Sequence, residues 1–244
     1  YTSDWPKWTG DWRVNPNHHP DGLVDVARHA KETGKKFLLW FEPERVLENT
    51  PVAKAHPEYF LRMENGWSIL LDLGNAEAWD YVFSMLCEKI ETIGLDWYRQ
   101  DFNIDPLPFF LQNDPKGLSG STELRYINGE YRLLDRLLER FPRLMIDNCA
   151  SGGRRIDPEM MKRSIPLWRS DVYCAANWNT AYGQMHQTGY GLWTVHSGAG
   201  TGRTLGDLYR FRSAYAPALA VAYYNTSRET VNKSPEEVAW MKRA

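Results

Sequence analysis

Two acidic residues, Asp101 and Asp171, stand where short strand-like runs end and loops begin. They close the segments D-W-Y-R-Q-D-F-N and I-P-L-W-R-S-D, in which apolar residues lead up to each carboxylate. In a parallel α/β barrel, a carboxylate at the carboxyl end of a strand points into the mouth where such barrels keep their active sites. Two carboxylates suffice to cleave a glycosidic bond. The pair is therefore a candidate catalytic pair for glycoside chemistry.

The composition favours a sugar ligand over several other partners. The 244 residues carry a net charge of −2 and are 43% hydrophobic, which is typical of a globular chain. Eleven Trp and thirteen Tyr are unusual. The C–H faces of sugar rings lie flat on aromatic rings, although large aromatics also fill cores. Because no basic run interleaves with aromatics and no apolar stretch approaches the roughly 20 residues of a membrane span, we expect no nucleic-acid partner and no membrane partner.

Cysteine and histidine usage predicts neither a metal site nor a disulfide framework. Cys87, Cys149 and Cys174 have no C-x-x-C spacing, and none of the six His is spaced with carboxylates as a metal ligand. We therefore expect no cofactor, and a reducing, cytoplasmic compartment is favoured although the localisation stays open. The chain begins at Tyr1 without a leader-like segment, so we expect an upstream region.

Helical and strand-like patterns alternate along the chain. Helices are predicted at residues 21–33, at 76–93 between the N-cap Asn75 and Gly94, at 121–140 and at 205–214. Strands are predicted at residues 36–42, 95–102, 144–148, 165–168, 191–195 and 218–223. The helix at 121–140 is expected to bury Leu124, Ile127, Leu134 and Leu137 or Leu138.

Repeated strand-loop-helix units predict a parallel α/β protein, and this length favours a (β/α)8 TIM barrel over an open sheet. No strand precedes the first helix, because residues 1–15 have the pattern of a Trp-rich loop. We therefore expect one catalytic (β/α)8 barrel domain over residues 1–244, a fragment that lacks the first strand and belongs to a longer multidomain chain.

Chemically active side chains gather at the ends of four predicted strands. The four clusters are L-W-F-E-P-E-R, Y-R-Q-D-F-N, D-N-C-A-S-G-G-R-R-I-D and W-R-S-D. Each cluster is a weak signal by itself, because E-P-E can be a strand end turned by proline and S-G-G a tight turn. Four clusters at successive strand ends favour an active site.

The wording and order of these clusters resemble the retaining α-galactosidases of glycoside hydrolase family 36. In that family G-D-W-x-V-N, W-F-E-P-E, K-W-D-M-N, N-C-A-S-G-G-G-R-x-D and W-x-S-D recur at matching separations. Here the matching segments stand at residues 10–15, 40–44, 99–103, 148–157 and 168–171, so the resemblance covers nearly the whole chain. It implies a hydrolase that removes terminal α-linked galactose with retention.

The resemblance also implies a role for each matching residue. Asp101 is similar to the nucleophile, which holds the sugar as a covalent glycosyl-enzyme, and Asp171 is similar to the general acid/base. The implied substrate contacts are Trp12, Glu44, Arg99, Asn103, Cys149, Gly152 and Trp168. The implied partner is a carbohydrate, and a homo-oligomer is possible.

Departures from the family pattern leave the sugar open. The family Lys is Arg99, one family glycine is Arg154, and S-D-N-T-D is replaced by S-D-V-Y-C, which places Val172 after the aspartate. The paired aspartates that bind the 4- and 6-hydroxyls of galactose in the family are expected upstream of Tyr1. An α-N-acetylgalactosaminidase and a raffinose-synthase-type galactosyltransferase are the alternatives within this chemistry. A non-catalytic sugar-binding barrel is a further alternative, which has no need of two opposed carboxylates.

Overall fold

The computed structural model describes residues 5–64, 66–175, 178–194, 196–201, 207–220 and 234–243. The chain forms two compact units, Tyr1–Ile146 and Asp147–Ala244, hereafter unit 1 and unit 2. In the described ranges no helix combines the length and the apolar character needed to cross a bilayer. The predicted elements at residues 191–195, 205–214 and 218–223 lie partly outside these ranges.

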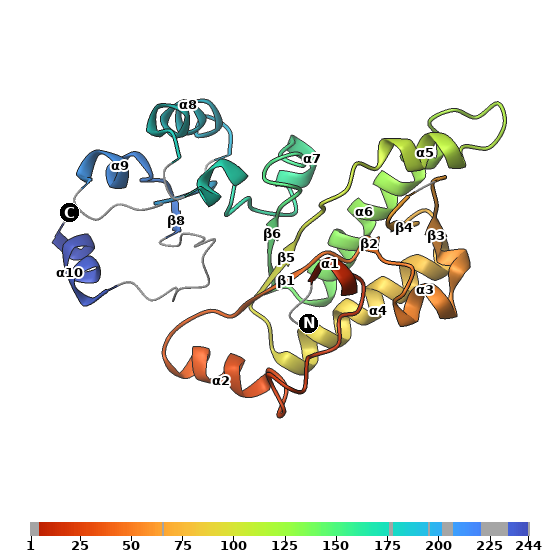
Figure 1. The fold of residues 1–244 in the computed structure, drawn as a ribbon, viewed down its shortest axis with the longest axis horizontal. Helices are drawn as coiled ribbons and strands as arrows, with labels where there is room; N and C mark the ends of the chain where they lie inside the picture. Colours follow the sequence, from red (N-terminus) through yellow and green to blue (C-terminus); the bar gives the residue numbers. More distant parts are fainter. Residues whose placement is uncertain are drawn as a thin grey trace. The chain divides into compact units, whose positions relative to one another are not determined.

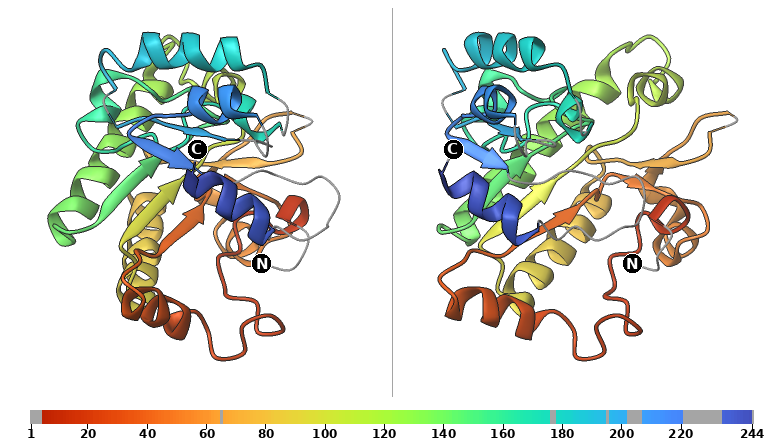
Figure 2. Two further views of the ribbon diagram at one scale, coloured as in Figure 1. Left: turned by 90° about the vertical axis from the view of Figure 1, so that its left-hand side faces the viewer. Right: turned by 60° about the vertical axis from the view of Figure 1, so that its left-hand side comes forward.

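A three-stranded sheet contains two strands of unit 1 and ends in a third strand, which runs from unit 1 into the first residues of unit 2 (Figure 1). Its strand order is β1 (Leu38–Phe41), β5 (Trp97–Gln100) and β6 (Met145–Asn148), which is also their order along the chain. Strands β1 and β5 are parallel, and both views of Figure 2 show their arrows side by side. This sequential order agrees with a (β/α) barrel, and one half of a doubly wound sheet has the same order. The described strands fall into three sheets, so closure into a barrel stays a prediction.

Three helices alternate with these strands. Helix α2 (Val24–Glu32) precedes β1, α4 (Ala76–Ile93) lies between β1 and β5, and α6 (Ser121–Arg140) lies between β5 and β6 in the chain. Helix α4 contacts both α2 and α6. Both α4 and α6 have a buried apolar face, and the two faces include Val82, Leu86, Ile90, Leu133, Leu134 and Leu137. The alternation of strand and helix is confirmed for this unit.

Local sequence sets both ends of α4, as predicted. The side chain of Asn75 accepts hydrogen bonds from the backbone N–H groups of Glu77 and Ala78, so it satisfies donors that have no partner inside the helix. Gly94 ends the helix in the left-handed conformation, with φ of 79°, which glycine adopts without a Cβ clash.

Helix α6 has the predicted bounds, but part of its predicted core is wrong. Leu124 is 64% exposed and Ile127 is 38% exposed. The buried face passes instead through Tyr126 and Gly129, because the backbone of Gly129 approaches Leu73 so closely that a Cβ would lie 2.1 Å from the Leu73 carbonyl oxygen. This close contact selects which face of the helix is turned inward.

Short elements that the sequence pattern does not predict complete unit 1. A small antiparallel sheet has the order β2 (Arg45–Val46), β4 (Ile69–Leu71) and β3 (Phe60–Leu61). Strands of two or three residues carry no readable periodicity. The remaining elements are α1 (Trp5–Trp8), α3 (Pro51–Ala55), η1 (Pro57–Tyr59) and α5 (Leu107–Asn113).

Unit 2 pairs one short parallel ladder with several helices. Strand β7 (Gly198–Gly200) is parallel to β8 (Ala218–Ala220). The helical elements are α7 (Pro158–Met161), η2 (Asp171–Cys174), α8 (Thr180–Tyr190), α9 (Leu208–Ser213) and α10 (Pro235–Arg243). The helix predicted at 205–214 is confirmed as α9 over the residues described, and β8 lies within the strand predicted at 218–223.

Two strands predicted in unit 2 are wrong over the residues that the structure describes. The segment at 165–168 forms an isolated parallel bridge between Asp147 and Ile165, and the carbonyl oxygen of Pro166 accepts from the N–H of Gly198 at 3.2 Å, but the segment does not form a strand. Pro166 has no N–H for a ladder, and the N–H of Leu167 donates to the buried carboxylate of Asp147 at 2.9 Å. The segment at 191–195 begins as a turn, because the N–H of Thr194 returns to the end of α8 at a distance of 2.7 Å from the carbonyl oxygen of Tyr190.

Candidate active site

Asp101 follows β5 directly, at the carboxyl end of the parallel sheet. Its N–H donates to the carbonyl oxygen of Phe41 at 2.9 Å, which extends the pairing with β1. The half-buried carboxylate accepts hydrogen bonds on both oxygens, from the indole Nε1 of Trp40 at 3.0 Å and from the N–H of Phe102 at 2.7 Å. The two donors fix the orientation of the carboxylate.

Aromatic side chains pack around Trp40, which donates to this carboxylate. Trp12 is half-buried and packs against Trp40 and Phe41, with ring centroids 6.1 and 5.5 Å apart. Arg99, half-buried, stands opposite Trp40 in the β1–β5 register. The structure therefore gathers Trp12 and Arg99 near Asp101. Trp40 is not among the predicted site residues, although it is the first residue of the W-F-E-P-E motif, which is the signal that could have identified it.

The E-P-E-R segment holds the loop that follows Asp101. Arg45 donates to both oxygens of Glu42, at 2.7 and 2.6 Å, and the two side chains are 1% and 0% exposed. The backbone N–H of Asn103 donates to Glu42 Oε1 at 2.6 Å. The buried ion pair thus anchors the loop through Asn103, a predicted substrate contact whose side chain is half-buried.

Glu44, another predicted substrate contact, lies in a buried network. Its Oε1 accepts from the amide of Gln100 at 2.8 Å, and its Oε2 accepts from the hydroxyl of Tyr126. The same amide donates to Glu130 at 2.7 Å. Glu44 is 0% exposed, so its side chain does not lie on the surface where a sugar could reach it in this structure. The contact with a sugar stays a prediction.

Removing the buried counter-ion of Arg45 should destabilise unit 1 strongly. For Glu42→Gln we expect a loss of about 3–5 kcal/mol in the free energy of unfolding, because the buried guanidinium loses the charge of Glu42. The matched control is Asp25→Asn, since Asp25 and Arg28 also pair at i,i+3 but are 66% and 61% exposed. That change should alter stability by less than about 1 kcal/mol. Chemical denaturation measures both, and equal losses would contradict the role of burial.

Asp171 begins the short helix η2 in unit 2. Ser170 caps this turn, because its hydroxyl accepts from the N–H of Val172 at 3.3 Å. The carboxylate is exposed, and its Oδ1 accepts from the indole Nε1 of Trp168 at 3.2 Å. The thiol of Cys174 lies 4.0 Å from the same oxygen. Trp168, predicted to contact the substrate, is thus a hydrogen-bond partner of Asp171.

The glycine-rich loop lies against the backbone of Asp171. Gly152 has φ of +93°, and a Cβ at this position would lie 2.9 Å from the Asp171 nitrogen. Cys149 is buried, with its sulfur 3.7 Å from the carbonyl oxygen of Gly152. Unit 2 therefore brings together four predicted site residues, which are Cys149, Gly152, Trp168 and Asp171.

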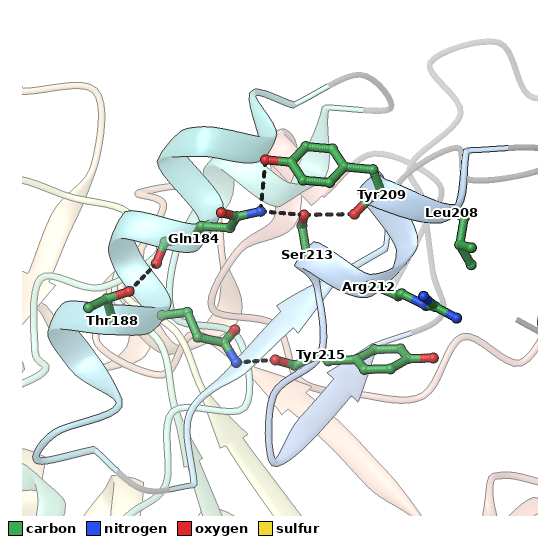
Figure 3. A pocket seen from close by; sticks show the side chains of 8 residues that line it. Gln184, Thr188, Leu208, Tyr209, Arg212, Ser213 and Tyr215 are labelled. Carbon is green, nitrogen blue, oxygen red and sulfur yellow. Dashed lines mark hydrogen bonds between the residues drawn. The ribbon is translucent and has the colours of Figure 1, made fainter.

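A groove lies between α8 and α9, and it is lined by none of the predicted site residues of unit 2 (Figure 3). It encloses about 680 Å³, and Figure 3 shows the amide of Gln184 bonded to the hydroxyls of Tyr209 and Ser213, at 2.9 and 2.8 Å. Its eight lining residues include none from the segment 168–174. The groove is thus distinct from the surroundings of Asp171.

The structure thus places one aspartate after a parallel strand and another beside a glycine-rich loop, and carboxylate pairs are the groups that glycoside hydrolases use. Residues 3–184 match the Melibiase family model. The chain belongs to this family and is a member of the α-galactosidase-like proteins of glycoside hydrolase family 36.

Individual relatives agree with this assignment. The α-galactosidase of Escherichia coli is 32% identical over 66% of this chain and 23% of its own length. The α-galactosidase Mel36A of Lactobacillus acidophilus is 30% identical over 66% of this chain and 23% of its own length. The present chain therefore spans about a quarter of the length of these relatives.

Solved structures are similar over almost the whole chain. The α-galactosidase of Lactobacillus brevis has a TM-score of 0.80 and 27% identity, and the match covers 97% of this chain and 33% of that one. A variant of the α-galactosidase AgaA of Geobacillus stearothermophilus, in complex with stachyose, has a TM-score of 0.78 and 25% identity, with 97% and 35% covered.

Proposed function

We propose that this chain carries the catalytic centre of a retaining α-galactosidase, built on a (β/α)8 barrel. The observation that carries the proposal is the match of Asp101 and Asp171 to the family's nucleophile and acid/base, together with the donors that orient each carboxylate. The substrate class is an α-galactoside, and stachyose in the AgaA relative is an example. The similarity to whole α-galactosidase structures over 97% of the chain supports the barrel.

In the first step, a carboxylate oxygen of Asp101 attacks the anomeric carbon of the galactose. The bond from this carbon to the leaving oxygen breaks, and protonated Asp171 gives its proton to that oxygen. A covalent ester between the sugar and Asp101 remains. The donors from Trp40 and Phe102 hold the carboxylate in one orientation for the attack, which lowers the entropic part of the barrier.

In the second step, water replaces the aglycone. The carboxylate of Asp171 takes a proton from the water as its oxygen attacks the anomeric carbon, and the ester bond to Asp101 breaks. Galactose leaves with its original anomeric configuration, and both aspartates return to their starting protonation states. Exposure of Asp171 is consistent with a group that must exchange a proton with water.

The other matching residues bind the sugar in this proposal. Trp12 offers an aromatic face, Arg99 and Asn103 offer hydrogen-bond donors beside Asp101, and Cys149 and Gly152 border the position of the acid/base. Glu44 acts through Gln100 of β5, since its carboxylate is fully buried.

Removing the indole donor of Trp40 should slow catalysis without unfolding the protein. For Trp40→Phe we expect kcat/KM to fall about 10- to 100-fold, the value of one hydrogen bond to a charged group. Trp97→Phe is the control, because Trp97 lies at the opposite end of β5. Initial rates with nitrophenyl α-galactoside measure the effect. A loss shared by both variants would assign it to general packing.

The full-length protein tests the proposed function directly. We expect it to release nitrophenol from nitrophenyl α-galactoside faster than from the α-N-acetylgalactosaminide, and to give galactose of retained configuration by NMR. Inversion, or no release from either glycoside, would overturn the proposal. Transfer to added sucrose at a rate above hydrolysis would instead favour the galactosyltransferase.

A further inference from the structure

The hydrogen bond from Trp168 to Asp171 gives Trp168 a role other than contact with the sugar. The indole Nε1 of Trp168 lies 3.2 Å from Oδ1 of Asp171, an exposed carboxylate at the start of a short turn. An indole N–H can donate a hydrogen bond but cannot accept one. In a protonated carboxyl group the carbonyl oxygen is the better acceptor, so this donor selects Oδ1 as the carbonyl oxygen.

The position of the Trp168 ring depends on a distant glycine. A Cβ at Gly200 would lie 2.5 Å from Cη2 and 2.7 Å from Cζ3 of the Trp168 ring. Gly200 is buried in β7, and its φ is not in the left-handed range, so close approach is the reason for glycine at this position. The ring also meets Tyr173 edge to face, with centroids 5.9 Å apart. Residues 168, 173 and 200 therefore fix the direction of the indole N–H.

We propose that Trp168 is a positioning residue for Asp171. Gly200 has no Cβ, and this leaves the space in which the Trp168 ring can take the required position. The bond from Trp168 occupies Oδ1, so the transferable proton resides on Oδ2. In the first step this proton passes from Oδ2 to the leaving oxygen, and in the second step Oδ2 takes a proton from water. The proposal rests on the proposed function, because it needs Asp171 to be the acid/base.

The test compares leaving groups in the full-length protein. For Trp168→Phe, which keeps the ring but removes the donor, we expect the first step to slow about 10- to 100-fold with phenyl α-galactoside. With dinitrophenyl α-galactoside, whose leaving oxygen needs no proton, we expect a change below about threefold. The matched control is Trp178→Phe, because Trp178 also packs on Tyr173, at 5.0 Å, and its buried Nε1 has no acceptor among the described residues.

A double-mutant cycle tests the part played by Gly200. Gly200→Ala displaces the ring, so it should reproduce the leaving-group dependence of Trp168→Phe. The double variant should be no slower than either single variant, because both changes remove the same bond. If Gly200→Ala does not fold, Trp168→Phe against Trp178→Phe still decides the question.

Asp171→Ala separates this inference from the proposed function. If Asp171→Ala shows no dependence on the leaving group, the acid role itself is wrong. If Asp171→Ala shows that dependence but Trp168→Phe slows both substrates equally, or neither, the positioning role of Trp168 is wrong.

Discussion

Asp101→Asn is expected to abolish turnover of every α-galactoside, whatever its leaving group. An amide cannot form the ester with the anomeric carbon, so the covalent route is closed and the residual rate should fall by roughly 10⁴-fold or more. The substitution keeps the shape of the side chain. Its NH2 group will face one of the two N–H donors, from Trp40 or Phe102, so a small loss of stability should accompany the loss of activity.

Asp105→Asn is the matched control for this variant. Asp105 belongs to the same loop, four residues further on, and its side chain is exposed. The same chemical change there should leave kcat/KM within about twofold. Rates with nitrophenyl α-galactoside and peptide mapping after a fluorosugar trap measure the outcome. A trapped sugar on any residue other than Asp101 would show that the nucleophile is elsewhere.

Asp171→Ala is expected to separate good leaving groups from poor ones. Phenyl α-galactoside should react roughly 10²- to 10⁴-fold more slowly, because its oxygen needs a proton as the bond breaks. Dinitrophenyl α-galactoside should still form the glycosyl-enzyme, which then accumulates because no base activates water. A burst of dinitrophenol followed by slow turnover is the expected time course. Azide needs no base, so it should restore turnover and give galactosyl azide.

Asp157→Ala provides the contrast in unit 2. The side chain of Asp157 caps α7 by accepting from the N–H groups of Glu159 and Met160 at 2.9 and 3.0 Å. Its removal should lower stability by about 1 kcal/mol and leave the leaving-group dependence unchanged. Similar leaving-group profiles for the two variants would contradict the acid/base role of Asp171.

Much of unit 1 can be predicted from sequence because its signals are local. The cap at Asn75 and the left-handed Gly94 use backbone groups within four residues, and α6 spans its predicted length. Unit 2 is harder, since β7 is three residues long and Pro166 interrupts the segment before Asp171. A short strand has too few residues for a readable periodicity, and proline has no N–H to donate to a neighbouring strand, so unit 2 gives weaker sequence signals than unit 1.

The candidate site divides in the same way. The sequence alone determined the family motifs and the place of Asp101 after a strand, because a strand end and a short motif are written in neighbouring residues. Only the tertiary structure decided what holds each carboxylate. Trp40 donates to Asp101 across 61 positions of the chain, and Gly200 of β7 leaves the space that the Trp168 ring occupies. It also decided that Glu44 is buried and that α6 turns Tyr126 inward in place of Leu124. Such contacts join distant segments, so they depend on how whole elements pack, and no local pattern encodes them.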